Sequence, residues 1–158
     1  MRVLFVCLGN ICRSPTAEAV LAREVAERDL ADRIEVDSAG TIGYHEGDRA
    51  DPRMREAAAA RGYELTSLAR RVAAEDLDRS DLVIAMDRSN LEDLLEIAEG
   101  AGPGARVKLR LLSDFLLDGA PVDVPDPYWG GPRGFDRVID LIEEAVPAIL
   151  AELLEKEG

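Results

Sequence analysis

The strongest constraint on this chain lies at its start, where a short apolar run leads through a glycine-containing turn into a helix signal. Residues 3–7 (Val-Leu-Phe-Val-Cys) form a continuous run of branched and aromatic residues, which is typical of a buried parallel strand. A Gly-Asn pair then breaks the run, and Ser14-Pro15 has the residue types of an N-cap and a first helical position. This order predicts a strand, a turn and a helix over residues 15–29, as at the start of an α/β protein.

The rest of the chain alternates between apolar runs and helical patterns, with one long exception. Further strands are predicted at residues 34–37, 82–86 and 106–112. Further helices are predicted at residues 53–61, 73–79, 91–99 and from residue 134 or 135 to 156. Residues 113–133 are rich in proline and glycine and are predicted to form a long loop, and such loops are often functional.

The alternation of strands and helices indicates a parallel sheet with helices on both faces. A chain of 158 residues has the length of one domain and can bury a sizeable core. We therefore predict an α/β fold in a single domain over residues 1–158, a three-layer α/β/α arrangement around a four-stranded parallel sheet. Ligands of such sheets bind beyond the carboxyl ends of the strands, where the loop after the first strand lies.

The loop between the first predicted strand and the first predicted helix has the residue types of a phosphate-binding loop. Successive backbone N–H groups of such a turn point into one concavity, and the helix that follows adds the positive end of its dipole. Arg13 adds a planar guanidinium that can hold two phosphate oxygens at once. The residues predicted to bind phosphate are Leu8, Gly9, Asn10, Ile11, Cys12, Arg13 and Ser14.

Cys7 would lie at the bottom of this concavity, at the end of the strand. The dipoles that attract phosphate also stabilise a thiolate, and the Ser14 hydroxyl could donate a hydrogen bond to the sulfur. A cysteine at a strand end is often only a small buried apolar residue, and a Cys-x5-Arg pattern is weak evidence by itself. Here the pattern has the strand, the turn and the helix start that the chemistry requires, so we predict that Cys7 is a nucleophile.

The net charge of −13 constrains what the protein can bind. It disfavours nucleic acids and anionic membranes as partners, and no segment approaches the length of a membrane span. The first apolar run is too short for a signal peptide, so we expect a cytoplasmic protein. A phosphorylated substrate is also an anion, and its binding depends on the local dipoles and Arg13, because distant carboxylates are screened over about 10 Å.

These residues are similar to the signature of a known family. The segment from Cys7 to Pro15, Cys-Leu-Gly-Asn-Ile-Cys-Arg-Ser-Pro, resembles the phosphate loop of the low-molecular-weight protein-tyrosine phosphatases. The similarity extends through nearly the whole chain. It includes Asp37-Ser-Ala-Gly-Thr, Tyr44-His-Glu-Gly, Asp51-Pro-Arg, Ala85-Met-Asp-Arg-Ser-Asn-Leu and the catalytic-acid motif Asp126-Pro-Tyr.

The resemblance implies a reaction in which Cys7 attacks phosphorus and becomes a phosphocysteine. Arg13 and the loop amides would hold the phosphoryl oxygens, and Asp126 would act first as general acid and then as general base. No metal ion or cofactor is needed for this chemistry. Only the Asp-Pro-Tyr match selects Asp126, because the residues alone leave three competing aspartates in the same loop, Asp114, Asp118 and Asp123.

Three aromatic residues, Tyr44, Tyr128 and Trp129, lie in predicted loops rather than in predicted core elements, and they are predicted to bind substrate. Contacts with a satellite core are the alternative. The resemblance implies that Tyr44 and Tyr128 wall a deep slot for a phosphotyrosine ring, in which phosphoserine is too short to reach the thiolate. The implied partner is a phosphotyrosine-containing protein, and inorganic phosphate or vanadate should inhibit.

Two further residues near the predicted site have other interpretations. Cys12 is either a small residue that fills the loop or, as the resemblance implies, the partner of Cys7 in a reversible disulfide that protects Cys7 from irreversible oxidation. His45, the only histidine, is assigned no catalytic role, because a lone histidine in a loop usually lies at the surface.

Three alternative functions are open. Thioredoxin-coupled arsenate reductases share the fold, but they need two further cysteines near the fourth strand, and residues 80–100 contain none. Protein-arginine phosphatases carry Thr at the loop position of Ile11, and the bulky Ile11 favours phosphotyrosine. An inactive phosphate-binding module is disfavoured, because all the chemical groups of the reaction are present.

Overall fold

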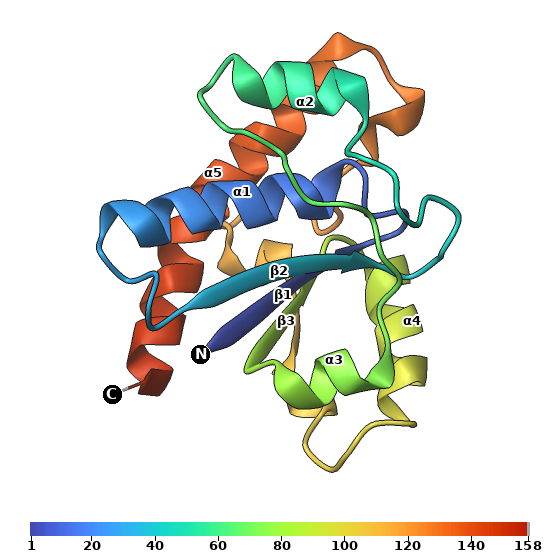
Figure 1. The fold of residues 1–158 in the computed structure, drawn as a ribbon, viewed down its shortest axis with the longest axis vertical. Coiled ribbons are helices and arrows are strands. Elements are labelled where there is room, and N and C mark those ends of the chain that lie inside the picture. The colour runs from blue at the N-terminus through green and yellow to red at the C-terminus, as the bar shows by residue number, and fades with distance from the viewer. Residues whose placement is uncertain (158) are drawn as a thin grey trace.

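The computed structural model describes residues 1–157, and a four-stranded sheet lies at its centre (Figure 1). The strands are β1 (Arg2–Cys7), β2 (Glu35–Gly40), β3 (Leu82–Ala85) and β4 (Leu109–Leu111). All neighbouring strands are parallel, in the order β2-β1-β3-β4. The predicted α/β fold with a four-stranded parallel sheet is thereby confirmed.

Helices cover both faces of this sheet. They are α1 (Arg13–Glu27), α2 (Pro52–Ala59), α3 (Ala74–Arg79), α4 (Arg88–Ala98) and α5 (Pro132–Glu157). Alternate residues of β1 point to opposite faces, so that Phe5 packs in one core with α1 and α5, whereas Leu4 packs in a second core with α3 and α4. In Figure 1, α1 and α5 accordingly lie on one side of the strands and α3 and α4 on the other.

The structure corrects the predicted end of the sheet and the predicted long loop. The predicted strand at residues 106–112 is a strand only over Leu109–Leu111, because short 3-10 turns flank it on both sides. The loop before α5 contains another 3-10 turn, Pro127–Trp129. This turn begins where the Asp126 carboxylate accepts a hydrogen bond from the Tyr128 N–H.

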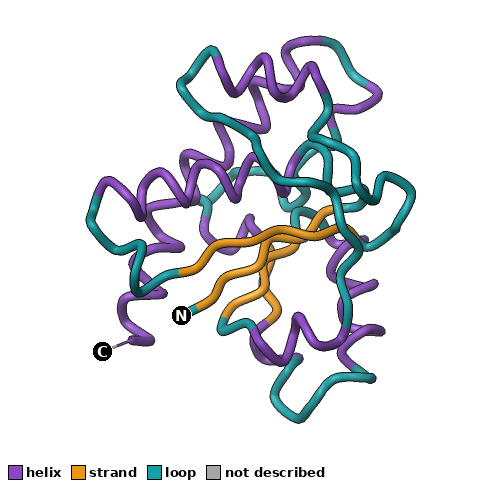
Figure 2. The backbone as a smooth tube through the Cα atoms, viewed as in Figure 1, coloured by secondary structure: helices purple, strands orange, loops and turns teal. Residues whose placement is uncertain are grey.

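Loops gather beyond the carboxyl ends of the strands (Figure 2). Three of them, after β1, after β2 and before α5, contribute residues to one pocket. Parallel strands make this possible, because all of their carboxyl ends lie along the same edge of the sheet. Among the described residues, no helix is long and apolar enough to cross a membrane.

Candidate active site

The loop between β1 and α1 surrounds the sulfur of Cys7. Cys7 ends β1 and is buried, with Asn10 N–H donating to its Sγ at 3.3 Å and Ser14 Oγ at 2.9 Å from the same atom. α1 begins at Arg13, so the prediction that Ser14 caps the helix is wrong. Ser14 lies in the first turn of α1. Its Oγ accepts from Asn10 Nδ2 at 2.8 Å, and its own proton can be donated to the Cys7 sulfur to stabilise negative charge there.

Asn10 holds this loop in a conformation that most residues avoid. Its φ is 58°, in the left-handed region. Its amide nitrogen lies 2.8 Å from Ser14 Oγ and 3.0 Å from Ser38 Oγ, and its Oδ1 accepts from the Arg70 N–H at 3.0 Å. Asparagine tolerates this φ and also supplies the donor and the acceptor that these bonds need.

β2 supports the loop from its neighbouring position in the sheet. Ser38 donates to the Glu18 carboxylate at 2.5 Å, and burial raises the pKa of Glu18 despite this bond. A Cβ at Gly40 would lie 2.7 Å from the Leu8 carbonyl oxygen. Glycine at this position therefore allows the phosphate loop to lie directly against the end of β2.

Arg13 is buried and held by groups from two other segments. Its Nη1 donates to Asp87 at 2.7 Å and to the Val124 carbonyl at 3.0 Å. Burial by itself would lower the pKa of Arg13, but the negative charges of Cys7 and Asp87 raise it. Asp87 also accepts from Asn90 N at 2.7 Å as the N-cap of α4, so the helix start fixes the partner of Arg13.

Asp126 lies opposite the phosphate loop. Its Oδ2 is 3.6 Å from Arg13 Nη2, and its Oδ1 accepts from the Tyr128 N–H at 3.0 Å. Two of the competing aspartates have other partners, because Asp123 pairs with Arg88 and Asp114 with Arg110. Of the four aspartates of this loop, Asp126 is the one that lines the pocket with Cys7.

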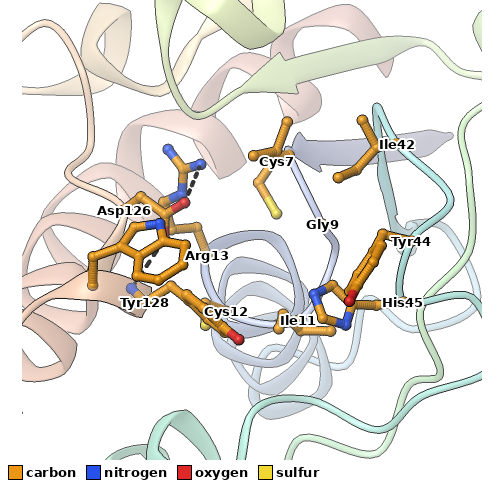
Figure 3. Close-up of a pocket in the computed structure, with 12 residues that line it drawn as sticks. Cys7, Gly9, Ile11, Cys12, Arg13, Ile42, Tyr44, His45, Asp126 and Tyr128 are labelled. Carbon is orange, nitrogen blue, oxygen red and sulfur yellow. Dashed lines mark hydrogen bonds and ion pairs between the residues drawn. The ribbon is translucent and has the colours of Figure 1, made fainter.

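The pocket between these segments has a volume of about 290 Å³ and an apolar rim. In Figure 3, Tyr44 and Ile42 lie on one side of the Cys7 sulfur, and Asp126 and Tyr128 lie on the other. Tyr44 packs edge to face on His45, and Tyr128 packs edge to face on Trp129. The remaining lining residues come from the phosphate loop: Leu8, Gly9, Ile11, Cys12 and Arg13.

The structure adds two residues that the sequence did not assign to the site, Ile42 and His45, both of which line the pocket. The His45 ring would lie 3.1 Å from a Cβ at Gly9, and its Nδ1 is 3.3 Å from the Asp48 carboxylate. The one sequence signal for them was their position beside Tyr44 in a glycine-containing loop. Among residues 1–157, no group of three or more His, Cys, Asp or Glu is placed to hold a metal ion.

Cys12 is buried in the wall of the pocket, and both cysteines are free thiols. Burial raises the pKa of Cys12, and the negative charge of Asp51 raises it further. The two cysteines of the loop therefore differ in their surroundings, since the Cys7 sulfur accepts from the Asn10 N–H and lies 2.9 Å from Ser14 Oγ. The reversible disulfide between them stays a prediction.

Arg53 braces the far wall of the pocket against α2. It makes a double ion pair with Asp51, and its hydrogen bonds are the main cause that lowers the pKa of Asp51. The same guanidinium donates to the Tyr128 carbonyl at 3.2 Å and lies over the Tyr128 and Phe135 rings at 5.3 and 4.9 Å. The wall that carries Tyr128 is thus tied to the N-cap of α2.

The chain matches a known family over nearly its whole length. A sequence profile of the family described as low molecular weight phosphotyrosine protein phosphatase matches residues 2–158. The chain is 43% identical to a low molecular weight protein-tyrosine-phosphatase of Streptomyces coelicolor, over 98% of this chain and 94% of that protein.

Solved structures are similar over nearly the whole chain. A protein tyrosine phosphatase from Entamoeba histolytica has a TM-score of 0.93 and 42% identity, covering 100% of this chain and 99% of that one. A structure described as the Drosophila arginine phosphatase has a TM-score of 0.90 and 34% identity, covering 97% of this chain and 98% of that one.

Proposed function

This chain belongs to the low molecular weight phosphotyrosine protein phosphatase family and is a protein-tyrosine phosphatase, and we propose that it acts through a phosphocysteine on Cys7. The observation that carries the proposal is the position of the Cys7 sulfur, which accepts from the Asn10 N–H and lies 2.9 Å from Ser14 Oγ inside a loop that also presents Arg13. Asp126 faces the same pocket from another segment of the chain. A nucleophile, an anion site and a proton donor are therefore within one cavity.

The phosphoryl group binds to the loop amides and to Arg13. Arg13 Nη1 is engaged by Asp87 and Val124, which leaves Nε and Nη2 to donate to two phosphoryl oxygens. These donors are fixed before substrate arrives, so they need little reorganisation when charge develops on the equatorial oxygens.

In the first step, the Cys7 thiolate attacks phosphorus and a P–S bond forms as the P–O bond to the phenol breaks. Asp126 donates its proton to the leaving phenolate oxygen. In the second step, water attacks the phosphocysteine and Asp126 accepts a proton from it. The P–S bond breaks, its electron pair returns to sulfur, and inorganic phosphate leaves. The Asp126 side chain is 34% exposed, which gives the attacking water access to its carboxylate.

The substrate ring occupies the space between Tyr44 and Tyr128, with Trp129 at the entrance. A phosphate that must reach the base of this pocket favours the long phosphotyrosine side chain over phosphoserine. We propose a phosphotyrosine-containing protein as the partner and inorganic phosphate and vanadate as inhibitors. We further propose that the chain is one catalytic domain and that it acts in the cytoplasm. We propose no nucleic acid or membrane partner, because a net charge of −13 repels nucleic acids and anionic membranes.

The test is Cys7→Ser, measured by turnover of p-nitrophenyl phosphate. A serine hydroxyl is a much weaker nucleophile than a thiolate, so we expect turnover to fall by roughly a thousandfold or more. Circular dichroism and vanadate binding report whether the fold and the anion site persist. Turnover close to that of the wild type in Cys7→Ser would end the proposal.

A further inference from the structure

The active-site pocket continues into a groove that the proposed reaction does not use. Ile11, His45 and Tyr128 line both the active-site pocket and an adjoining pocket of about 350 Å³. The adjoining pocket also contains Arg49 and Arg55, and both of these arginines line a third pocket of about 370 Å³ along α2. The three pockets share walls, and together they lead from Cys7 past two cations.

Among the residues that the structure describes, Arg49 and Arg55 differ from most arginines because they have no carboxylate partner. Arg53, between them in the sequence, is paired with Asp51 at 2.9 Å. Within residues 1–157, neither Arg49 nor Arg55 has a carboxylate oxygen at ion-pair distance. Arg55 Nε donates to the Ala50 carbonyl at 3.0 Å, which fixes the guanidinium and leaves both Nη groups free to donate.

The carboxylates that line the adjoining pocket do not neutralise these arginines. Asp51 is buried and is engaged by Arg53, whose hydrogen bonds lower its pKa. Asp48 is exposed and lies 3.3 Å from His45 Nδ1. The adjoining pocket therefore offers two unpaired guanidiniums beside one exposed carboxylate, on a protein whose net charge is −13.

We propose that this groove binds an acidic side chain of the substrate, a Glu or Asp within about three residues of the phosphotyrosine. The inference rests on the proposed phosphotyrosine hydrolysis and adds a specificity site to it. An extended chain advances about 3.3 Å per residue, so a peptide that leaves the slot past Ile11 and Tyr128 reaches the arginines within a few residues. The carboxylate accepts a forked pair of hydrogen bonds from Arg55, and Arg49 adds a second positive charge.

The test uses phosphotyrosine heptapeptides that carry a single Glu at each position from three before to three after the phosphotyrosine, each compared with the Gln peptide. In the wild type, we expect kcat/KM to be roughly three- to ten-fold higher for Glu than for Gln at one or two positions, falling with added salt. In the double variant Arg49→Gln with Arg55→Gln, the ratio should fall to about one. Both peptides are measured with the same enzyme preparation, so a loss of active enzyme does not change the ratio of their kcat/KM values.

The matched control is Arg106→Gln, which removes an exposed arginine before β4, away from the carboxyl ends of the strands. Arg106→Gln should keep the Glu preference, because it removes a positive charge away from the groove. A second double variant, Arg49→Glu with Arg55→Glu, should prefer Lys peptides over Gln peptides.

A Glu preference that survives in the double Gln variant, or that Arg106→Gln abolishes equally, would overturn the proposal. So would a wild type that hydrolyses all peptides alike. A wild type that hydrolyses neither the peptides nor p-nitrophenyl phosphate would instead refute the proposed function on which the inference rests.

Discussion

The base and the rim of the active-site pocket are built in opposite ways. At the base, Asn10, Arg13 and Ser14 are almost completely buried, and their side chains bond to other loop, strand and helix residues. At the rim, Tyr44 and Trp129 are 84% and 87% exposed, and their rings meet neighbouring rings edge to face. A fixed base suits charge stabilisation, because its dipoles need not reorganise during the reaction. An exposed rim can adapt to different substrates.

This contrast predicts that substitutions in the two regions affect substrates and stability differently. A change at the base should affect every substrate and also the stability of the fold. A change at the rim should affect only those substrates that are large enough to reach it. Asp126 lies at the edge of the base, and Ile11 lies between the base and the rim.

Among the variants that keep Cys7, the largest effect is expected for Asp126→Asn, which removes the proposed proton donor at the edge of the base. We expect kcat for phenyl phosphate to fall by roughly 10²- to 10³-fold, and kcat for p-nitrophenyl phosphate to fall less, because a good leaving group needs less protonation. The control is Asp123→Asn, three residues away, whose carboxylate is bonded to Arg88. Equal losses on both substrates would remove Asp126 as the acid.

Asn10→Ala tests whether the base is held rigid by one side chain. The alanine variant keeps the strained φ but loses the hydrogen bonds of the Asn10 side chain. We therefore expect the free energy of unfolding to fall by roughly 1–3 kcal/mol, and kcat/KM to fall for every substrate. Asn10→Gly relieves the backbone strain but not the lost bonds, and it should be intermediate in stability. Denaturant unfolding and steady-state kinetics measure both effects. Full stability in both variants would show that the loop is held by other contacts.

Ile11→Thr tests the residue that links the base to the rim and to the adjoining groove. Ile11 is 8% exposed and packs in the core beneath α2. A smaller, polar side chain should raise the ratio of phosphoarginine to phosphotyrosine hydrolysis, by roughly five-fold or more. An unchanged ratio would count against Ile11 as the residue that favours phosphotyrosine.

The smallest effect is expected at the rim. Tyr44→Ala should raise KM for phosphotyrosine peptides roughly two- to five-fold through lost ring contact, while the free energy of unfolding stays within about 0.5 kcal/mol of the wild type. Trp129→Ala provides the matching change on the opposite wall. If either variant lost as much stability as Asn10→Ala, the distinction between base and rim would fail.

The sequence by itself determined the α/β fold, and it predicted the loop that surrounds the Cys7 sulfur. Both depend on local features, namely the continuous apolar runs at residues 3–7 and 82–86 and the contiguous segment from Cys7 to Ser14. A nucleophile, a turn and a helix start that follow one another in the chain can be recognised from their order, because backbone dipoles act over short distances.

Only the tertiary structure decided which distant groups complete the site. It paired Arg13 with Asp87 and with the Val124 carbonyl, and it brought Ile42 and His45 into the pocket. Among residues 1–157, it also left Arg49 and Arg55 without a carboxylate partner beside that pocket, although most of the arginines there have acidic partners. These contacts join segments that are far apart in the sequence, and they arise from how strands and helices pack at the carboxyl edge of the sheet. No local pattern of residues specifies that packing.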